Sequence, residues 1–434
     1  MSTISIVGLG VVGEPLAKAF EREGHEVYGY DISKDRIAAL VEQQSEGGFP
    51  EGVNLTTGPN HISDCDFVVI TVPTPVDKSN QPNLEIVAEA ASTVGNYLSR
   101  DTIVILESTV YPGATREVVI PALEESSGFS SGDEFTVGYS PERVNPGAEH
   151  NTVESTVKVV SAQDNRALGR VQSLYESIVR AGVHVAPTIE TAEAAKCLEN
   201  IQRDVNIGLV NEFAMACDTL DIEIDPNAVL EAAGTKWNFQ KYSPGIVGGH
   251  CIPVDPYFMI SRLERAGYSP NLMKQARSVN EEYPSHTASK IAEQIIEVHS
   301  NAGKIHTTKS SGTEESSSHV PTVLLLGMAY KSNTVDIRNR GLRRFIKTLQ
   351  QHHIDVFGYD PHIDDEVISS YFGIDVPDEL DLASYDGVVI NTYSTEFNHL
   401  GLEKHYNRPS SPKIFDLSGS LNLDTFEKPD WVRH

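Results

Sequence analysis

Cys251 is the residue best placed in this sequence to act as a nucleophile. It follows Gly248 and Gly249 and precedes Asp255 by four residues. Glycines allow close approach of the backbone, so the thiol would be presented at a turn, and a nearby carboxylate or lysine can manage its proton. The pattern leaves open a buried structural thiol. A thiolate–imidazolium pair with His250 is disfavoured, because adjacent residues of an extended turn usually point apart.

Lys196 and Asn200 form a second candidate group. They stand four residues apart in a helical pattern, so they share one face of the helix. A lysine and an amide placed in this way can hold an oxyanion or a water molecule. An ordinary exposed pair has the same spacing, and the pattern alone does not separate the two.

The other cysteines carry no chemical signal. Cys65, Cys197 and Cys217 lie in apolar strand or helix patterns and are interpreted as structural thiols. The sequence contains no CxxC pair, which argues against a zinc knuckle, and a large cytoplasmic chain does not favour a disulfide framework. His352 and His353 have no matching partners, so no metal site is predicted.

A glycine-rich turn near the start of the chain predicts a dinucleotide site. The run GLGVVG at 8–13 follows a strand pattern and opens a helix, so its backbone can approach a pyrophosphate at a helix N-terminus. Asp31 follows Gly13 by eighteen residues. Its carboxylate can accept the ribose hydroxyls and would repel a 2′-phosphate, which favours NAD over NADP. Tyr30 and Lys34 match a YxxxK pair, but they lie far from where short-chain dehydrogenases place theirs.

The elements that must position these residues follow from hydrophobic patterning. Residues 1 to about 187 alternate strands and helices, which predicts a doubly wound parallel sheet. The expected strands are 5–8, 26–30, 67–72, 102–107, 136–139 and 157–160. Residues 189–220 form one long helical pattern without proline, which carries Lys196 and Asn200, and helical sequence continues to about 301.

A second α/β pattern begins after a polar, Ser/Thr-rich stretch at 302–320, which is interpreted as a flexible insertion. Its first turn, GMAYK at 327–331, lacks the GxGxxG spacing, so no second dinucleotide is expected there. Cations gather at this turn and the helix after it: Lys331, Arg338, Arg340, Arg343 and Arg344. Such a cluster can hold a phosphorylated group, and a solvated basic helix face is the alternative.

Composition and charge exclude several classes of protein. Hydrophobic residues make up 39% and charged residues 22%, a globular composition, and no stretch reaches the ~20 apolar residues of a membrane span. The start lacks the basic region of a signal peptide, so a cytoplasmic protein is expected. A net charge of -27 argues against binding to nucleic acid or anionic membranes. We interpret the spread-out acid excess as adaptation to high salt, with a merely acidic mesophilic enzyme as the alternative.

Seven motifs in order resemble the UDP-glucose/GDP-mannose dehydrogenase family of nucleotide-sugar 6-dehydrogenases. They are GLGVVG (8–13), TVPTPVD (71–77), ESTVYPGAT (107–115), SPERVNPG (140–147), AAKCLEN (194–200), GGHCIPVDP (248–256) and GMAYKSNTVDIR (327–338). The resemblance implies an α/β fold with two Rossmann-like parallel-sheet domains joined by a long central helix. Its implied domains are an NAD-binding domain (1–187), a helical dimerisation region (188–301), the polar insertion (302–320) and a UDP-binding domain (321–434), in a homodimer or higher homo-oligomer.

The family reaction is a four-electron oxidation of a sugar CH2OH to the carboxylate, with two NAD+ and one water. By resemblance, Cys251 traps the aldehyde as a thiohemiacetal, and a second oxidation leaves a thioester that water hydrolyses. Lys196 and Asn200 polarise the sugar oxygen and stabilise oxyanions, and Asp255 positions water and shuttles protons.

The remaining site residues are implied by the same resemblance. Thr109 lies near the reacting centre, and Glu142 lies where cofactor and sugar meet. The implied cofactor contacts are Gly8, Gly10, Val11, Val12, Gly13, Asp31, Arg36, Pro73, Thr74, Thr109 and Glu142. The implied substrate contacts are Glu142, Arg143, Val144, Lys196, Asn200, Tyr242, Gly248, Lys331 and Arg338.

Two departures from the glucose-oxidising branch bear on the substrate. Pro146 stands where that branch has a second glutamate, and Val254 stands where it commonly has a lysine. Both changes resemble the branch that acts on UDP-N-acetylhexosamines, so UDP-N-acetylmannosamine or UDP-N-acetylglucosamine is expected in preference to UDP-glucose.

Two other classes compete with this interpretation. A non-catalytic NAD-sensing protein would not need Cys251, Lys196, Asn200 and Asp255 together. A two-electron β-hydroxyacid-type dehydrogenase needs neither the cysteine nor a second α/β domain.

Overall fold

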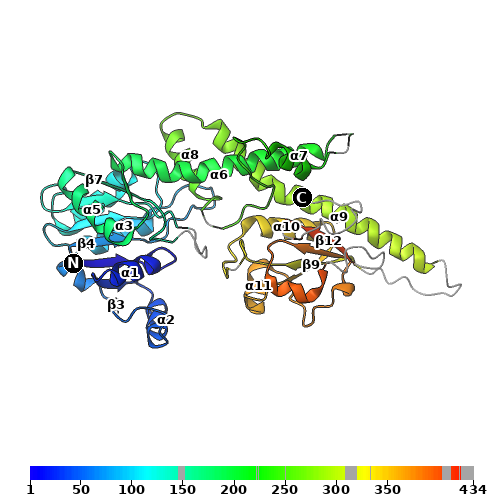
Figure 1. Cartoon of the computed structure of the whole chain (residues 1–434), viewed down its shortest axis with the longest axis horizontal. Coiled ribbons are helices and arrows are strands. Elements are labelled where there is room, and N and C mark those ends of the chain that lie inside the picture. Colours follow the sequence, from blue (N-terminus) through cyan, green and yellow to red (C-terminus); the bar gives the residue numbers. More distant parts are fainter. Residues whose placement is uncertain are drawn as a thin grey trace. The chain divides into compact units, whose positions relative to one another are not determined.

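The computed structural model describes residues 1–144, 152–220, 222, 224–249, 251–307, 320–332, 334–402, 412–419 and 421 (Figure 1). The chain divides into two compact units. Unit 1 comprises Met1–Ile201 and Val254–Pro270, and unit 2 comprises Gln202–Pro253 and Asn271–His434. Among the described residues, no helix is both long and apolar enough to cross a membrane. Pro146 and His250 lie outside the described residues.

Unit 1 is built on an eight-stranded sheet with the order β3-β2-β1-β4-β5-β6-β7-β8. Its strands are β1 (Thr3–Val7), β2 (Glu26–Tyr30), β3 (Val53–Thr56), β4 (Phe67–Ile70), β5 (Ile103–Leu106), β6 (Thr136–Tyr139), β7 (Lys158–Ala162) and β8 (Val183–Val185). The helices that belong wholly to unit 1 are α1 (Gly13–Arg22), α2 (Lys34–Ser45), α3 (Glu85–Gly95), α4 (Ile120–Ser127), α5 (Asn165–Ile178) and α8 (Asp255–Arg265).

The predicted doubly wound sheet is confirmed, with its last two strands, β7 and β8, running opposite to the other six. Every neighbouring pair is parallel except β6 and β7, which run antiparallel. The prediction of a parallel sheet is therefore wrong for β7, because apolar patterning reports burial and carries no information on strand direction. The reversal brings Lys158, at the start of β7, to the edge of the sheet where β5 and β6 end.

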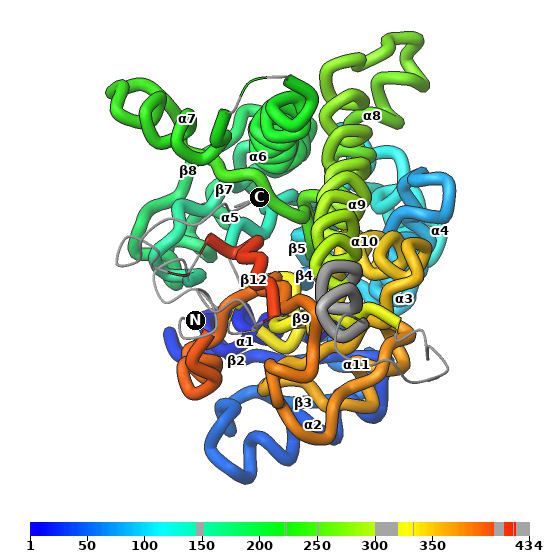
Figure 2. Tube along the Cα trace, turned by 90° about the vertical axis from the view of Figure 1, so that its right-hand side faces the viewer, coloured from blue at the N-terminus to red at the C-terminus, as the bar shows by residue number. Residues whose placement is uncertain are grey.

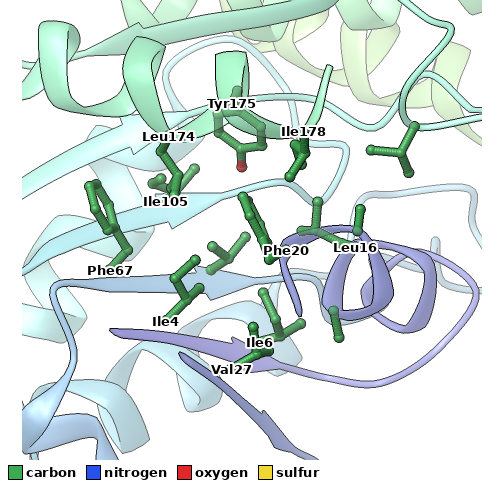
Figure 3. Close-up of a cluster of buried hydrophobic side chains, with 14 of the residues drawn as sticks. Ile4, Ile6, Leu16, Phe20, Val27, Phe67, Ile105, Leu174, Tyr175 and Ile178 are labelled. Carbon is green, nitrogen blue, oxygen red and sulfur yellow. The ribbon is translucent and has the colours of Figure 1, made fainter. Parts of the chain in front are cut away.

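The core of unit 1 lies between the sheet and the helices α1 and α5. The central strands β4 and β5, with sequences FVVI and IVIL, are buried at every position, as expected for strands covered on both faces. Figure 3 shows Phe20 of α1 and Tyr175 of α5 in one buried cluster with Ile105, and the centroids of the two rings lie 5.9 Å apart. This packing holds the turn between β1 and α1 in a fixed position.

Unit 2 contains a four-stranded parallel sheet with the order β10-β9-β11-β12. Its strands are β9 (Thr322–Leu326), β10 (Asp355–Tyr359), β11 (Gly387–Ile390) and β12 (Lys413–Asp416), and its helices are α7 (Pro226–Ala233), α9 (Asn271–Thr307), α10 (Arg340–Gln351) and α11 (Asp365–Phe372). Helix α10 lies alongside α9 (Figure 2), and Phe345 and Leu349 share an apolar core with Ile291 and Ile295. The predicted second α/β pattern is confirmed.

Two long helices, α6 and α9, make up most of the helical middle of the chain. Helix α6 (Ile189–Cys217) is continuous, and its residues are divided between unit 1 and unit 2 at Ile201. Helix α9 extends to Thr307, so it includes the first residues of the stretch expected to be a flexible insertion. The residues 308–319 of that stretch lie outside the described part of the chain.

Candidate active site

The glycine turn of unit 1 has the geometry that a bound pyrophosphate requires. Gly8 has φ +95°, and a Cβ on Gly13 would stand 2.0 Å from the Gly8 carbonyl oxygen. The Thr71 hydroxyl donates to that same carbonyl at 2.6 Å, which ties the turn to the end of β4. A Cβ on Gly10 would meet no atom within 4 Å. The backbone is therefore open in front of the α1 N-terminus, so the turn fits a dinucleotide phosphate.

Asp31 and Arg36 stand beside this turn. The Asp31 carboxylate accepts the Leu9 amide at 2.9 Å and the Ser33 amide at 2.8 Å. The Arg36 side chain donates to the Leu9 carbonyl at 2.7 Å and pairs with Glu14 at 2.5 Å. Two carboxylates, Asp31 and Glu14, thus lie beside the glycine turn, and the sequence pattern had indicated only Asp31.

The other predicted cofactor residues follow the carboxyl ends of parallel strands. Val11 and Val12 complete the glycine turn, and Val11 is about half exposed. Pro73 and Thr74 follow β4, and Thr109 follows β5. These positions lie along one edge of the sheet, the edge at which open α/β sheets bind their ligands.

A buried charged cluster occupies the same edge. Lys158 donates to Glu107 at 2.8 Å, and the Tyr175 hydroxyl also donates to Glu107. The Lys158 ammonium lies 3.7 Å from the Glu142 carboxylate. Burial raises the pKa of Glu107, and the Glu142 charge adds to the effect while Lys158 opposes it. Sequence reasoning selected Glu142 and missed its two buried neighbours, Glu107 and Lys158.

Next to Glu142, the predicted substrate residues Arg143 and Val144 are held by local contacts. Their backbone amides both donate to one oxygen of Glu142, at 2.7 Å and 2.5 Å. The Arg143 guanidinium pairs with Glu199 of α6 at 2.8 Å and donates to the Val157 carbonyl at 2.6 Å. Glu199 therefore links this loop to the long helix.

The first half of α6 presents a buried polar stripe. Glu193, Cys197 and Asn200 are fully buried and Lys196 is 8% exposed, as helical spacing on one face predicts. The Asn200 amide donates to Asp255, the first residue of α8. The structure therefore joins Asn200 to Asp255 and places Lys196 one helical turn before Asn200, all in unit 1. Lys196 and Asn200 are buried, so they are not an ordinary exposed pair.

Glu193 fastens this stripe to the loop after β5, and sequence reasoning missed it. Its carboxylate accepts the Gly113 amide at 2.6 Å, the Thr115 amide at 2.9 Å and the Thr115 hydroxyl at 2.6 Å. Glu193 lies three residues before Lys196, on the same face of the helix, and this spacing could have identified it from the sequence. Within the described part of the chain, the buried Tyr139 hydroxyl has no hydrogen-bond partner.

Cys251 belongs to unit 2, where the segment before it is packed against the first turn of the second sheet. The Gly249 amide donates to the Arg338 carbonyl at 3.0 Å. A Cβ on Gly248 would lie 2.8 Å from the Asn339 amide and 2.9 Å from Tyr330. Cys251 itself is exposed, whereas Cys65, Cys197 and Cys217 are buried. Burial raises the pKa of Cys65 to about 12, which makes that thiol inert.

The remaining predicted substrate residues lie in unit 2. Lys331 lines a small surface hollow with Gly327, Ala329, Asp360 and Ser394. Asp360 accepts the Met328 and Ala329 amides at 2.8 and 3.2 Å, as Asp31 does for the Leu9 amide in unit 1. The structure thus repeats one turn chemistry in both sheets, after the matching Gly-Tyr-Asp runs of β2 and β10.

The arginines of the expected basic cluster do not point toward one common site, because Arg338, Arg343 and Arg344 each have a different partner. Arg338 makes a two-pronged ion pair with Asp336, at 2.9 and 2.8 Å. Arg343 lies over the Tyr371 ring, and Arg344 donates to the Glu281 carbonyl of α9. Tyr242 exchanges hydrogen bonds with Gln202 at 3.1 and 3.3 Å. Among the described residues, no group of three His, Cys, Asp or Glu side chains gathers as a metal site.

Comparison with known proteins gives matches along the whole chain. Three sequence models of the UDP-glucose/GDP-mannose dehydrogenase family match: the NAD binding domain at residues 2–179, the central domain at 190–282 and the UDP binding domain at 324–422.

Individual proteins match over nearly their full length. The chain is 38% identical to Protein CapL of Staphylococcus aureus, over 97% of this chain and 96% of the relative. It is 37% identical to the UDP-N-acetyl-D-glucosamine 6-dehydrogenase of Pseudomonas aeruginosa, over 97% of both. A solved UDP-D-ManNAc dehydrogenase of Pyrococcus horikoshii superposes with a TM-score of 0.77 at 26% identity, over 98% of this chain and 96% of that one.

Proposed function

We propose, because this chain belongs to the UDP-glucose/GDP-mannose dehydrogenase family, that it oxidises C6 of a UDP-N-acetylhexosamine to the carboxylate with NAD. The observation that carries the proposal is the buried contact between Asn200 and Asp255, with Lys196 on the same helix face. These three residues are the ones that the family resemblance assigns to proton transfer and oxyanion stabilisation. Lys196 and Asn200 come from α6 and Asp255 from α8, and the Asn200–Asp255 hydrogen bond joins the two helices.

The proposed reaction divides its tasks among four residues. Lys196 and Asn200 stabilise negative charge on the sugar oxygen, and Asp255 accepts and returns protons and positions the hydrolytic water. The Cys251 sulfur adds to the aldehyde as a thiohemiacetal and is released when water cleaves the later thioester. NAD+, when bound at the Gly8–Gly13 turn, accepts the hydride of each oxidation. The balance is RCH2OH + 2 NAD+ + H2O → RCOO⁻ + 2 NADH + 3 H⁺.

The choice of sugar rests on two lines of support. The names of the relatives in Pseudomonas and Pyrococcus specify N-acetylated hexosamines. Replacement of an acid by Pro146 also removes a charge from the expected wall of the sugar site. A site that offers a hydrogen-bond partner to an acetamido group leaves it unpaired with UDP-glucose, which costs roughly 1–3 kcal/mol, or about ten- to a hundredfold in kcat/KM.

We also propose that the protein works as a homodimer or larger homo-oligomer in the cytoplasm. Two large apolar side chains of α6 are strongly exposed in the single chain, Leu198 at 57% and Leu209 at 63%. Exposed apolar side chains on both halves of one long helix are consistent with a partner that covers them.

The test is a panel of UDP-sugars assayed with NAD+ at equal concentrations. The proposal expects UDP-N-acetylglucosamine or UDP-N-acetylmannosamine to give the highest kcat/KM and a product heavier than the substrate by one oxygen and lighter by two hydrogens. If UDP-glucose equals or exceeds both, the substrate is wrong and the 6-dehydrogenase activity stands. If no UDP-sugar is oxidised by a folded protein that binds NAD, the activity itself is wrong.

A further inference from the structure

A lysine lies buried between two carboxylates at the edge of the NAD-binding sheet. The side chain of Lys158 is 6% exposed, that of Glu107 is 0% exposed and that of Glu142 is 16% exposed. A buried lysine is tolerated only when its charge is compensated, and here one ammonium faces two carboxylates. Glu107 and Lys158 were assigned no part in the reaction above.

The sheet itself explains why these residues meet. Strand β7 pairs antiparallel with β6, with Gly138 opposite Ala162 and Tyr139 opposite Ser161. Continuing this register past the end of β6 places Glu142 opposite Lys158. Glu107 follows directly on Leu106, the last residue of β5, which is the next strand along. The reversal of β7 is therefore what delivers a cation to the edge where the parallel strands end.

The contacts of Lys158 are divided between the two acids. It makes a hydrogen bond of 2.8 Å to Glu107, whereas its 3.7 Å separation from Glu142 is a Coulombic contact and too long for a hydrogen bond. The ring of Tyr175 lies under the ammonium at 5.1 Å, and its hydroxyl donates to Glu107. Glu107 and Tyr175 thus fix the position of Lys158, and Lys158 faces Glu142 from that position.

The other cation near Glu142 is turned away. Arg143 pairs with Glu199 and donates to the Val157 carbonyl. One oxygen of Glu142 accepts the Arg143 and Val144 amides, and the other faces Lys158. Both oxygens of Glu142 are consequently held, one by backbone donors and one by a buried charge.

We propose that Lys158 is a positioning residue for Glu142, held in place by Glu107 and Tyr175, and that turnover depends on this buried cation. Lys158 acts by holding the Glu142 carboxylate oriented and charge-balanced beside the cofactor edge. The inference rests on the proposed function for its turnover assay, so a second readout that needs no substrate accompanies it.

The decisive comparison separates positioning from simple stability. Lys158→Met leaves the buried Glu107 and the partly buried Glu142 without this cation, so it should lower both the thermal midpoint and kcat. The double variant Lys158→Met/Glu107→Gln removes one of those carboxylates, so its thermal midpoint should recover most of the loss. Its kcat should stay about tenfold or more below wild type, because Glu142 still lacks its cation. Lys158→Arg should keep kcat within about threefold, and Lys347→Met on α10 is the surface control.

A coupling experiment tests whether Lys158 works through Glu142. The triple variant Lys158→Met/Glu107→Gln/Glu142→Gln should have a kcat no lower than that of the single variant Glu142→Gln. A double variant that recovers stability and kcat together would show a purely structural role and overturn the proposal. The proposal would also be overturned if the fold-loss of kcat in the triple variant equalled the product of the fold-losses in the double variant and in Glu142→Gln.

Hydrogen exchange supplies the readout that is independent of activity. The Arg143 and Val144 amides, which donate to Glu142, should exchange faster in the double variant and stay protected in Lys158→Arg. Unchanged protection in a folded double variant would contradict the proposal even if the enzyme proved inactive on every UDP-sugar. Inactivity of the wild type alone would count against the proposed function and leave this measurement to decide the role of Lys158.

Discussion

Asp255 begins helix α8 with its side chain bonded to Asn200, and Cys251 precedes it by four residues. Residue types and spacing could predict Cys251, Lys196 and Asn200 as candidates, because a thiol at a glycine turn and an i, i+4 pair are local patterns. They could not predict the contact between Asn200 and Asp255, which are separated by 55 positions in the chain. Nor could they identify Glu107 and Lys158, since a charge at a strand end reads as solvent-exposed until the neighbouring strand is known.

Replacing the proposed nucleophile separates chemistry from cofactor binding. In Cys251→Ala we expect no carboxylate product, because the aldehyde is no longer held for the second oxidation, while NAD affinity stays within about twofold. Binding is measured by NADH fluorescence titration and product by mass spectrometry. Cys217→Ala, at a buried thiol of α6, is the matched control and should keep turnover. Loss of NAD affinity in folded Cys251→Ala would contradict the assignment.

Cofactor choice tests the two carboxylates beside the glycine turn. Asp31→Asn keeps an acceptor for the Leu9 amide but removes a charge that repels a 2′-phosphate, so the kcat/KM ratio of NADP to NAD should rise about tenfold. Adding Glu14→Gln should raise it again, because Arg36 then loses its anionic partner. A ratio unchanged in both variants would mean that these carboxylates do not set the preference.

At the scale of elements, the strands that line the site could be predicted to within two residues of their ends, because each is a short apolar run. The strands β3 and β8 were not predicted, since their sequences, VNLT and VHV, are short and only partly buried. The direction of β7 was not predicted for a different reason. The direction of a strand depends on how it pairs with its neighbour in the sheet, and the sequence of the strand itself does not report this pairing. The long helix could be predicted from its unbroken pattern, and it ends at Cys217 where Leu220 was expected.

Glu193 of α6 accepts hydrogen bonds from the loop after β5, and we expect the stability that this contact provides to depend on pH. Burial raises the pKa of Glu193 above its ordinary value of 4.5. A carboxyl with a raised folded-state pKa contributes its stability below the unfolded pKa and loses it as pH rises through the folded pKa. The free energy of unfolding of wild type minus that of Glu193→Gln should therefore fall as pH rises above 4.5, as urea titrations would measure. A difference that grows with pH would contradict the assigned environment.

For the whole molecule, the net charge of -27 is the dominant feature. Charges of one sign repel across the surface in dilute buffer, and the screening length falls from about 10 Å at 0.1 M salt to about 3 Å at 1 M. We expect the thermal midpoint to rise steadily between these KCl concentrations. Sucrose at matched water activity is the control, since it strengthens apolar burial without screening charge. A flat or falling midpoint in KCl would argue for an ordinary acidic surface.

Assembly is the second whole-molecule prediction. Covering Leu198 and Leu209 removes apolar area from water, which favours association, and molar salt lowers the repulsion between two acidic chains. Light scattering in 1 M KCl should give at least twice the mass of one 47.5 kDa chain. Leu209→Glu should shift the protein toward monomer. A monomer in wild type at this salt concentration would contradict the proposed homo-oligomer.

The central claim is a four-electron oxidation through a cysteine-bound intermediate, and the NADH yield per product tests it most directly. A limiting amount of UDP-N-acetylglucosamine or UDP-N-acetylmannosamine is oxidised to completion with excess NAD+, and NADH absorbance is compared with the uronate counted by mass spectrometry. The account predicts two NADH for every carboxylate formed, with no free aldehyde. One NADH per product, with the aldehyde released, would identify a two-electron dehydrogenase and contradict the account.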